Sequence, residues 1–166
     1  AAVKNSGLPY TIFCPSWFFE MTFNFIRRKV ILGKHPRPYH WLSADDFGRM
    51  VAVAYQKEEA HNKHFYMMGP EPLLMHDVLP RICARLYPDI TSFRQVPLWM
   101  AKLIARATGN TRMLEGSRLM AYFDKIGIEV VGDPAEANAI LGAPETTLDQ
   151  WIAIQEADQV KSPWRP

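Results

Sequence analysis

Apolar residues along the chain fall into two patterns, short runs closed by proline or glycine and longer runs with helical spacing. The short runs predict strands at residues 10–14, 64–68 and 93–97, because five-residue apolar runs between turn residues are typical of buried strands. "HWLS" at 40–43 predicts a further strand of two or three residues, and "GIEVVGD" at 127–133 predicts a last strand or an extended loop.

The longer runs predict helices, several with recognisable ends. Ser43 and Thr147 stand where N-cap residues are expected, and Gly33 follows a basic turn where a helix would stop. Pro80 indicates that the regular part of its helix begins late. The predicted helices are 18–32, 44–57, 77–87, 99–107, 113–125, a short one from Pro134 to Leu141, and 148–160. Since strands and helices alternate, the predicted fold class is α/β.

Length and composition are those of an ordinary globular domain. The 166 residues predict one domain over 1–166, 48% of them are hydrophobic, and the net charge is only +2. Such a balance does not steer a protein toward nucleic acid or an anionic membrane. No run approaches the ~20 apolar residues of a membrane helix, and the start carries no export signal, so we expect a cytoplasmic protein.

The sequence lacks the common phosphate-binding and nucleophile motifs. It has no G-x-G-x-x-G fingerprint, no G-x-S-x-G elbow and no phosphate loop. His61 and His64 lie three residues apart in "HNKH", but this spacing on a loop entering a strand is more typical of solvated side chains than of a metal site. We therefore expect no metal centre and assign no catalytic residue from the motifs.

Two cysteines, Cys14 and Cys83, fall on different predicted elements, which favours a reduced pair of buried thiols over a disulfide. Cys14 ends a predicted strand, where open α/β sheets place their ligands. A buried and inert thiol is nevertheless the favoured interpretation, because no basic residue lies beside it in sequence.

The stretch "PSWFFE" leaves the end of the first predicted strand. In open α/β sheets, ligands lie beyond the carboxyl ends of the strands, so bulky aromatic residues there can line the binding site of a flat apolar ligand. The alternative is that Trp17, Phe18 and Phe19 pack into the core, and for at least one of the three this must hold.

Four blocks of the sequence resemble the NmrA-like group of atypical short-chain dehydrogenase/reductases. "SGLPYTIFCPSWFFEM" is similar to that group's SGL-x-YT-I-x-RP-G-W/F-F-M-E-N, and "WLSADDFGRMVAVAY" to its W-I-S/D-V-x-D-I/V-G/A-R-x-x-A. "KHFYMMGPEPLLMHDV" is similar to K-x-Y-x-L-T/S-GPE-x-LT-x-x-E, and "ILGAPETTLDQWI" to LG-x-P-x-TLE-x-W. The blocks occur in family order and span nearly the whole chain.

The resemblance is to half of such a protein. The opening "AAVKNSG" is similar to the end of the helix that carries a Tyr-x-x-x-Lys pair in active members, but no tyrosine lies four residues before Lys4. The glycine-rich phosphate turn belongs to the other half of the family fold. The resemblance thus implies the C-terminal part of a Rossmann-type parallel sheet plus a mostly helical substrate lobe.

The same resemblance implies a set of site residues. Pro15, Ser16 and Trp17 match the turn that meets the nicotinamide end of the cofactor. The residues matching the start of the substrate pocket, with the loop that approaches it, are Phe18, Phe19, Met21, Tyr39 and Trp41. Cys14, Ser16 and Met21 replace the family's usual Arg, Gly and Asn, and Met21 removes a polar side chain.

Two functions stay open on this basis. The first is the substrate-binding part of an NAD(P)-dependent reductase or epimerase-like protein, inactive by itself because it lacks the dinucleotide phosphate-binding half. The second is a non-catalytic, redox-sensor-like module that binds a small molecule or a protein. We expect a small apolar or aromatic ligand, NAD(P) bound at most weakly by this chain alone, and association with itself or with an N-terminal half.

Overall fold

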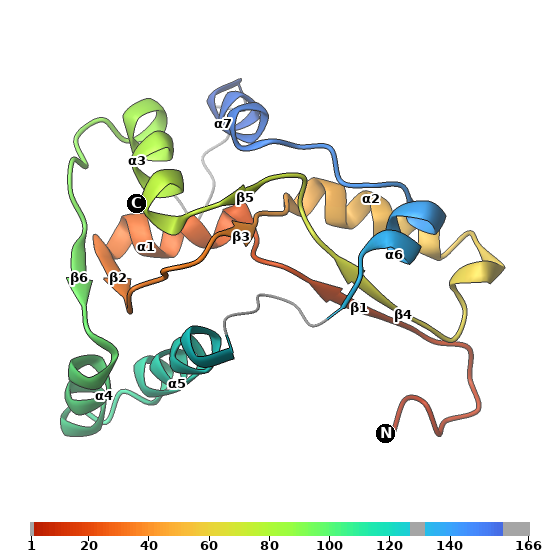
Figure 1. Cartoon of the computed structure of the whole chain (residues 1–166), viewed down its shortest axis with the longest axis horizontal. Helices are drawn as coiled ribbons and strands as arrows, with labels where there is room; N and C mark the ends of the chain where they lie inside the picture. Colours follow the sequence, from red (N-terminus) through yellow and green to blue (C-terminus); the bar gives the residue numbers. More distant parts are fainter. Residues whose placement is uncertain (1, 127–131, 158–166) are drawn as a thin grey trace. The chain divides into compact units, whose positions relative to one another are not determined.

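Short parallel strands alternate with helices in the computed structural model, which describes residues 2–126 and 132–157 (Figure 1). This confirms the α/β class. The contacts between Cα atoms divide the chain into two compact units. The first unit comprises Ala1–Glu20, Tyr39–Pro72 and Val130–Trp151, and the second comprises Met21–Pro38, Leu73–Glu129 and Ile152–Pro166.

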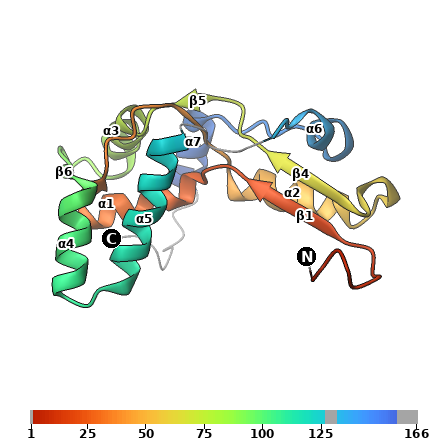
Figure 2. The same cartoon turned by 60° about the horizontal axis from the view of Figure 1, so that its bottom comes forward.

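The first unit is built on two parallel strands, β1 (Thr11–Pro15) and β4 (Lys63–Met67), which lie side by side in Figures 1 and 2. Helices α2 (Ala44–Ala54) and α6 (Ala135–Leu141) supply the rest of its core. The buried apolar residues of this core are Leu42, Met50, Ala54, Ala60, Phe65, Met67, Ala137 and Leu141. The unit also contains β3 (Tyr39–His40) and the 3₁₀ turn η2 (Glu58–Ala60).

Capping residues fix the starts of helix α2 and of the last helix. The Ser43 hydroxyl accepts a hydrogen bond from the Asp46 backbone N–H at 3.0 Å, as the sequence predicts for an N-cap. Thr147 likewise accepts from the backbone N–H of Gln150 at 3.3 Å, at the start of α7 (Leu148–Ala157). Both predicted caps are confirmed.

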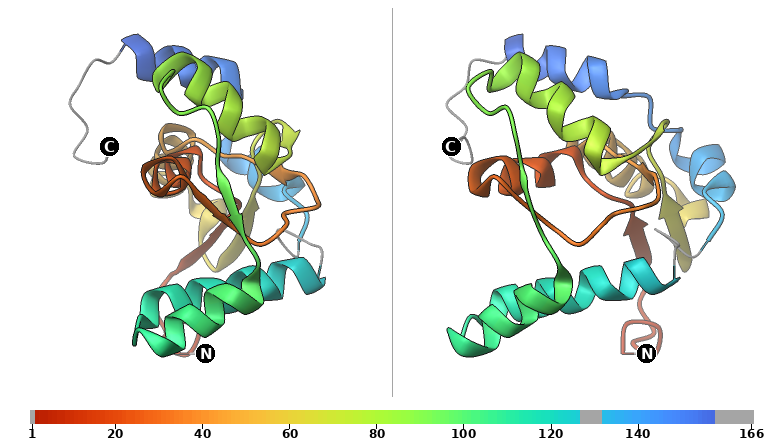
Figure 3. Two further views of the ribbon diagram at one scale, coloured as in Figure 1. Left: turned by 90° about the vertical axis from the view of Figure 1, so that its left-hand side faces the viewer. Right: turned by 60° about the vertical axis from the view of Figure 1, so that its left-hand side comes forward.

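The second unit contains the other parallel pair, β2 (Val30–Leu32) and β6 (Arg94–Val96). Its helices α4 (Leu98–Ala107) and α5 (Thr111–Ile126) lie side by side (Figure 3). Helices α1 (Thr22–Arg28) and α3 (Met75–Leu86) also belong to this unit. Three elements lie at the boundaries between the units' chain segments: the 3₁₀ turn η1 (Phe19–Met21), β5 (Pro72–Leu73) and α7.

The helix predicted over residues 18–32 is wrong at both ends. Helix α1 begins only at Thr22, after the 3₁₀ turn η1. Helix α1 stops at Arg28, because Lys29 takes the left-handed conformation with φ of 52°. The residues that follow form strand β2, paired with β6 from more than sixty residues away. The β-branched side chains of Val30 and Ile31 suit a strand better than a helix.

Several other boundaries differ from the prediction by one residue or more. Helix α3 begins at Met75 and contains Pro80 in its interior, so the expected late start is wrong. Helix α2 ends at Ala54 rather than at residue 57. After it the Gln56 N–H donates to the Val53 carbonyl, three residues back, which makes a tighter turn than the α-helix. Strand β3 is Tyr39–His40 and shares only His40 with the strand predicted in "HWLS". Most of the element predicted at 127–133 lies outside the described residues. The last three residues of the helix predicted at 148–160 also lie outside them.

No helix within residues 2–126 or 132–157 has the length and apolar character needed to cross a bilayer.

Candidate functional site

Ser16 fixes the turn at the carboxyl end of β1. Its backbone N–H donates to the Met67 carbonyl at 2.8 Å, which continues the β1–β4 ladder by one residue. Its hydroxyl donates a short hydrogen bond to the His40 carbonyl. The turn that the sequence assigns to the cofactor, Pro15 to Trp17, is therefore held by both β4 and β3.

A cluster of aromatic rings lies directly beyond this turn. The Trp17 ring lies 5.0 Å from Tyr39 and 6.1 Å from Trp41, measured between ring centroids. Phe19 stacks on Trp41 at 5.9 Å and on Trp151 at 5.4 Å. All five side chains are buried, with Phe19 and Trp41 having no exposed surface. The expectation that at least one aromatic residue after β1 packs into the core is confirmed by Phe19.

The other predicted site residues are more accessible. Phe18 is half-buried and meets Phe47 edge to face, with ring centroids 5.3 Å apart. Pro15 is half-buried as well, and the Met21 side chain in the second unit is 42% exposed. The roles of all eight residues in binding stay predictions.

Glu20 is a polar group that the sequence analysis did not single out. Its Oε1 accepts from the Trp151 indole N–H at 2.9 Å and from the Ala44 backbone N–H at 3.2 Å. Its Oε2 is buried and makes no hydrogen bond to any residue that the structure describes. The signal in the sequence was weak, because a single glutamate after three aromatic residues reads as a solvated side chain.

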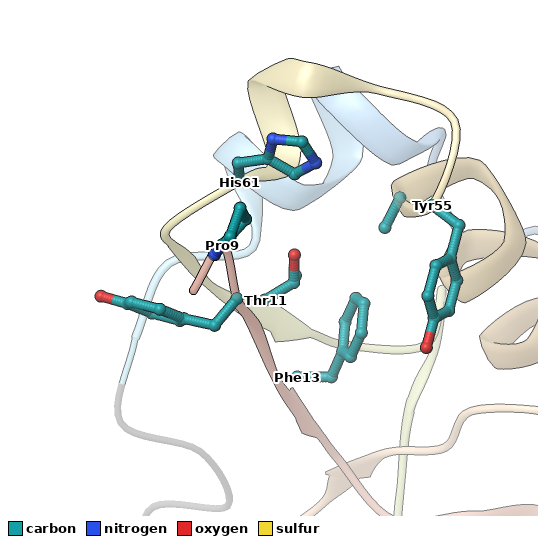
Figure 4. A pocket seen from close by; sticks show the side chains of 7 residues that line it. Pro9, Thr11, Phe13, Tyr55 and His61 are labelled. Carbon is teal, nitrogen blue, oxygen red and sulfur yellow. The ribbon is translucent and has the colours of Figure 1, made fainter. Parts of the chain in front are cut away.

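An opening of about 220 Å³ in the first unit lies at the amino end of β1, opposite to the predicted site. Figure 4 shows the side chains of Phe13, Tyr55 and His61 around it, with Pro9 and Thr11 at the start of the strand. Tyr55 is 86% exposed, so this opening is shallow and faces solvent on the side of Tyr55. It does not include any of the eight predicted residues.

The second unit has its own cavity, of about 330 Å³, at the carboxyl ends of β2 and β6. Gly33 and Lys34 follow β2 there, while Leu98 and Trp99 begin α4. The Gln95 amide donates to the Gly33 carbonyl at 2.8 Å and so ties the two strand ends together. The sequence analysis missed this cavity because it depends on the unpredicted strand β2.

Two ionisable groups are shifted by their surroundings. Burial raises the pKa of Asp46, but hydrogen bonds from Thr146, Arg49 and Glu145 outweigh it and leave this pKa below its usual value. Burial lowers the pKa of His35, against the smaller opposing effects of the Leu32 carbonyl and the Asp124 carboxylate. Both groups stabilise loops and neither is one of the eight predicted residues.

The two cysteines differ in their surroundings. Cys83 is buried in α3, as predicted, and Cys14 is only half-buried, so the prediction of two buried thiols is wrong for Cys14. The Cys14 Sγ lies 2.9 Å from Nε2 of His64. The described residues contain no group of three or more His, Cys, Asp or Glu side chains arranged to hold a metal ion.

Comparisons of the sequence with protein-family models and with curated proteins give no match. Comparison of the structure with solved structures gives several. An NADPH-dependent quinone oxidoreductase from Escherichia coli is 14% identical, with a TM-score of 0.62 over 93% of this chain and 57% of that one. A nucleoside-diphosphate-sugar epimerase from Staphylococcus aureus is 12% identical, with a TM-score of 0.62 over 90% and 54%.

A triphenylmethane reductase from a Citrobacter species, solved with NADP(H), is 12% identical, with a TM-score of 0.63 over 92% of this chain and 55% of that one. The present chain thus spans about half the length of these structures. They are reductases and an epimerase of the kind that the four sequence blocks indicate. The chain has the Rossmann-like α/β fold of these reductase and epimerase structures, over 90% or more of its own length.

Proposed function

We propose that this chain is the substrate-binding part of an NAD(P)-dependent reductase or epimerase-like protein of the NmrA-like group. The observation that carries the proposal is the fixed turn at Ser16, placed at the carboxyl end of parallel strand β1 with an aromatic cluster immediately beyond it. Open α/β sheets bind their ligands at this end of the strands.

Each part of the turn has a role in the proposal. Pro15 to Trp17 present backbone to the nicotinamide end of a cofactor whose phosphates are held by another half of the protein. Phe18 presents its accessible ring to the substrate. The buried rings of Phe19, Tyr39 and Trp41 contact one another next to this turn and fix its surroundings, because packed aromatic side chains form a rigid group. Met21 remains a proposed substrate contact on the strength of the family resemblance.

The substrate that fits such a surface is small, flat and apolar. The test is calorimetric titration of the 166-residue chain with 1-naphthol. The expected dissociation constant is about 0.1–1 mM, which a ligand of this size reaches at modest efficiency per atom. Phe18→Leu keeps the core side of the ring filled and should weaken binding about fivefold, since it removes the stacking surface.

Tyr55→Ala is the matched control, because Tyr55 lines the other opening of the same unit. It should leave the affinity unchanged. If Tyr55→Ala weakens binding and Phe18→Leu does not, the ligand occupies the amino end of β1 and the proposal is wrong. Sub-micromolar binding of NADPH to the chain alone would also contradict it, because the phosphate anchor is then not supplied by a second half.

A second candidate function is binding without catalysis, as a redox-sensor-like module. One observation favours it: the rings of Trp17, Phe19, Tyr39 and Trp41 are buried in contact with one another. Its partner would be a protein or a second copy of the chain. No binding of 1-naphthol at millimolar concentration would favour this candidate over the first.

A further inference from the structure

The face of the β1–β4 pair that is turned away from the core of the first unit carries a cysteine and a histidine in contact. Side chains alternate between the two faces of a strand. Phe13, Phe65 and Met67 belong to the face that packs against the core of the first unit. Cys14 and His64 therefore lie on the opposite face.

The register of the two strands brings these side chains together. Ile12 is opposite His64, and Cys14 is opposite Tyr66, so Cys14 and His64 are diagonal neighbours two residues out of step. Their Sγ and Nε2 atoms are 2.9 Å apart. His64 is exposed and Cys14 is half-buried, so a small reagent can reach the sulfur.

The imidazole is held in place by a third residue. The Tyr66 ring lies 5.0 Å from the His64 ring at an interplanar angle of 36°. Gly132 packs against Tyr66 so closely that a Cβ at position 132 would lie 2.1 Å from the Tyr66 ring. A nucleophile, a base within hydrogen-bond reach and a group that orients the base are the three parts of an activated thiol.

We propose that Cys14 is a nucleophilic thiol, activated by His64, that adds to α,β-unsaturated carbonyl compounds. The thiol proton passes to His64 Nε2 as the sulfur attacks the β-carbon of the acceptor. A C–S bond forms, the C=C π electrons move to give an enolate, and the imidazolium returns the proton to the α-carbon. The addition is complete without an oxidant or a reductant.

This inference is independent of the proposed function, because it uses no cofactor and none of the eight predicted site residues. It assigns to the chain a covalent modification site for soft electrophiles. Cys83 offers a comparison within the same molecule, since it is 2% exposed and burial raises the pKa of its thiol.

The test is timed alkylation of the 166-residue chain with N-ethylmaleimide, followed by mass spectrometry of the peptides that contain each cysteine. At neutral pH, Cys14 should react at least about fivefold faster than the free thiol of N-acetylcysteine, and Cys83 far more slowly. A Cys14 rate at or below that of N-acetylcysteine would overturn the proposal, and this measurement needs no variant.

His64→Gln separates activation from exposure. It should slow alkylation of Cys14 at least about fivefold at neutral pH, and the two rates should converge in alkaline solution, where any thiol ionises unaided. His61→Gln is the matched control and should leave the rate unchanged, since His61 lies at the amino end of β1. Equal rates for His64→Gln and the unmodified chain at neutral pH would show that Cys14 is merely exposed.

Discussion

The indole N–H of Trp151 donates a hydrogen bond of 2.9 Å to Oε1 of Glu20, a residue 131 positions earlier in the chain. The same oxygen accepts the first free backbone N–H of helix α2, from Ala44. Glu20 therefore links the beginning of α7 to the beginning of α2 within the first unit. The bond from Ala44 places a carboxylate at the start of α2, where negative charge is favourable.

Glu20→Ala should lower the free energy of unfolding by about 1–3 kcal/mol, because it leaves the buried Trp151 donor without its acceptor. Urea denaturation measures the change. Glu115→Ala is the control: Glu115 pairs with Arg118 on the surface of α5, and an exposed pair contributes at most about 1 kcal/mol. Equal losses for the two variants would show that the Glu20–Trp151 bond does not stabilise the fold.

Gly69 is expected to tolerate no side chain. A Cβ there would lie 1.6 Å from the backbone oxygen of Trp41, and a backbone atom cannot move aside as a side chain can. Gly69→Ala should therefore cost about 3 kcal/mol or more in the free energy of unfolding.

Gly48→Ala provides the opposite case on the same unit. Gly48 lies in the exposed interior of α2 with open space around its Cα, so the substitution should stabilise the chain by about 0.5–1 kcal/mol. Thermal melts of the two variants, side by side, check both values. A Gly69→Ala protein as stable as the unmodified chain contradicts the close approach of residues 41 and 69.

His35 should make stability depend on pH. Burial lowers its pKa below 6.5, with His76 acting in the same direction and Asp124 against it. The unfolded chain then takes up a proton near its ordinary pKa while folded His35 stays neutral. The contribution is complete above about pH 6.5 and is lost as the pH falls through the folded pKa, with a slope of at most about 1.4 kcal/mol per pH unit.

Denaturation between neutral and mildly acid pH measures this slope. His35→Gln should flatten it, and His61→Gln, which changes an exposed histidine, should keep it. If the free energy of unfolding of His35→Gln depends on pH as steeply as that of the unmodified chain, a group other than His35 causes the dependence.

The features that the sequence predicted correctly are local ones. Strand β1 ends at a proline, and Ser43 caps α2 through an atom only three residues away. The features that it missed depend on partners distant in the chain. Val30 and Ile31 form a strand because Arg94 and Gln95 pair with them.

The same reasoning applies to the candidate sites. The sequence offered no base for Cys14, because His64 lies fifty residues away and is brought near by strand register. It also left open whether Trp17 lines a pocket or packs in the core. Trp17 is buried against Tyr39 and Trp41, which return to the first unit after residues 21–38 have formed part of the second.

Association through β1 is the last prediction. Within residues 2–126 and 132–157, β1 pairs with β4 along one edge only, and all five of its residues are half-buried. A short apolar strand with one unpaired edge is a template for another strand. We therefore expect the chain to pair with itself, or with an N-terminal half that supplies the neighbouring strand of the family fold.

Light scattering of a dilute, freshly purified sample should give a mass above that of one chain. Ile12→Lys, which places a charge on β1, should shift the sample toward monomer, whereas Leu103→Lys, on the exposed surface of α4, should not. A stable, folded monomer at every concentration would refute the prediction, and dissociation by Leu103→Lys alone would assign the contact to α4 instead.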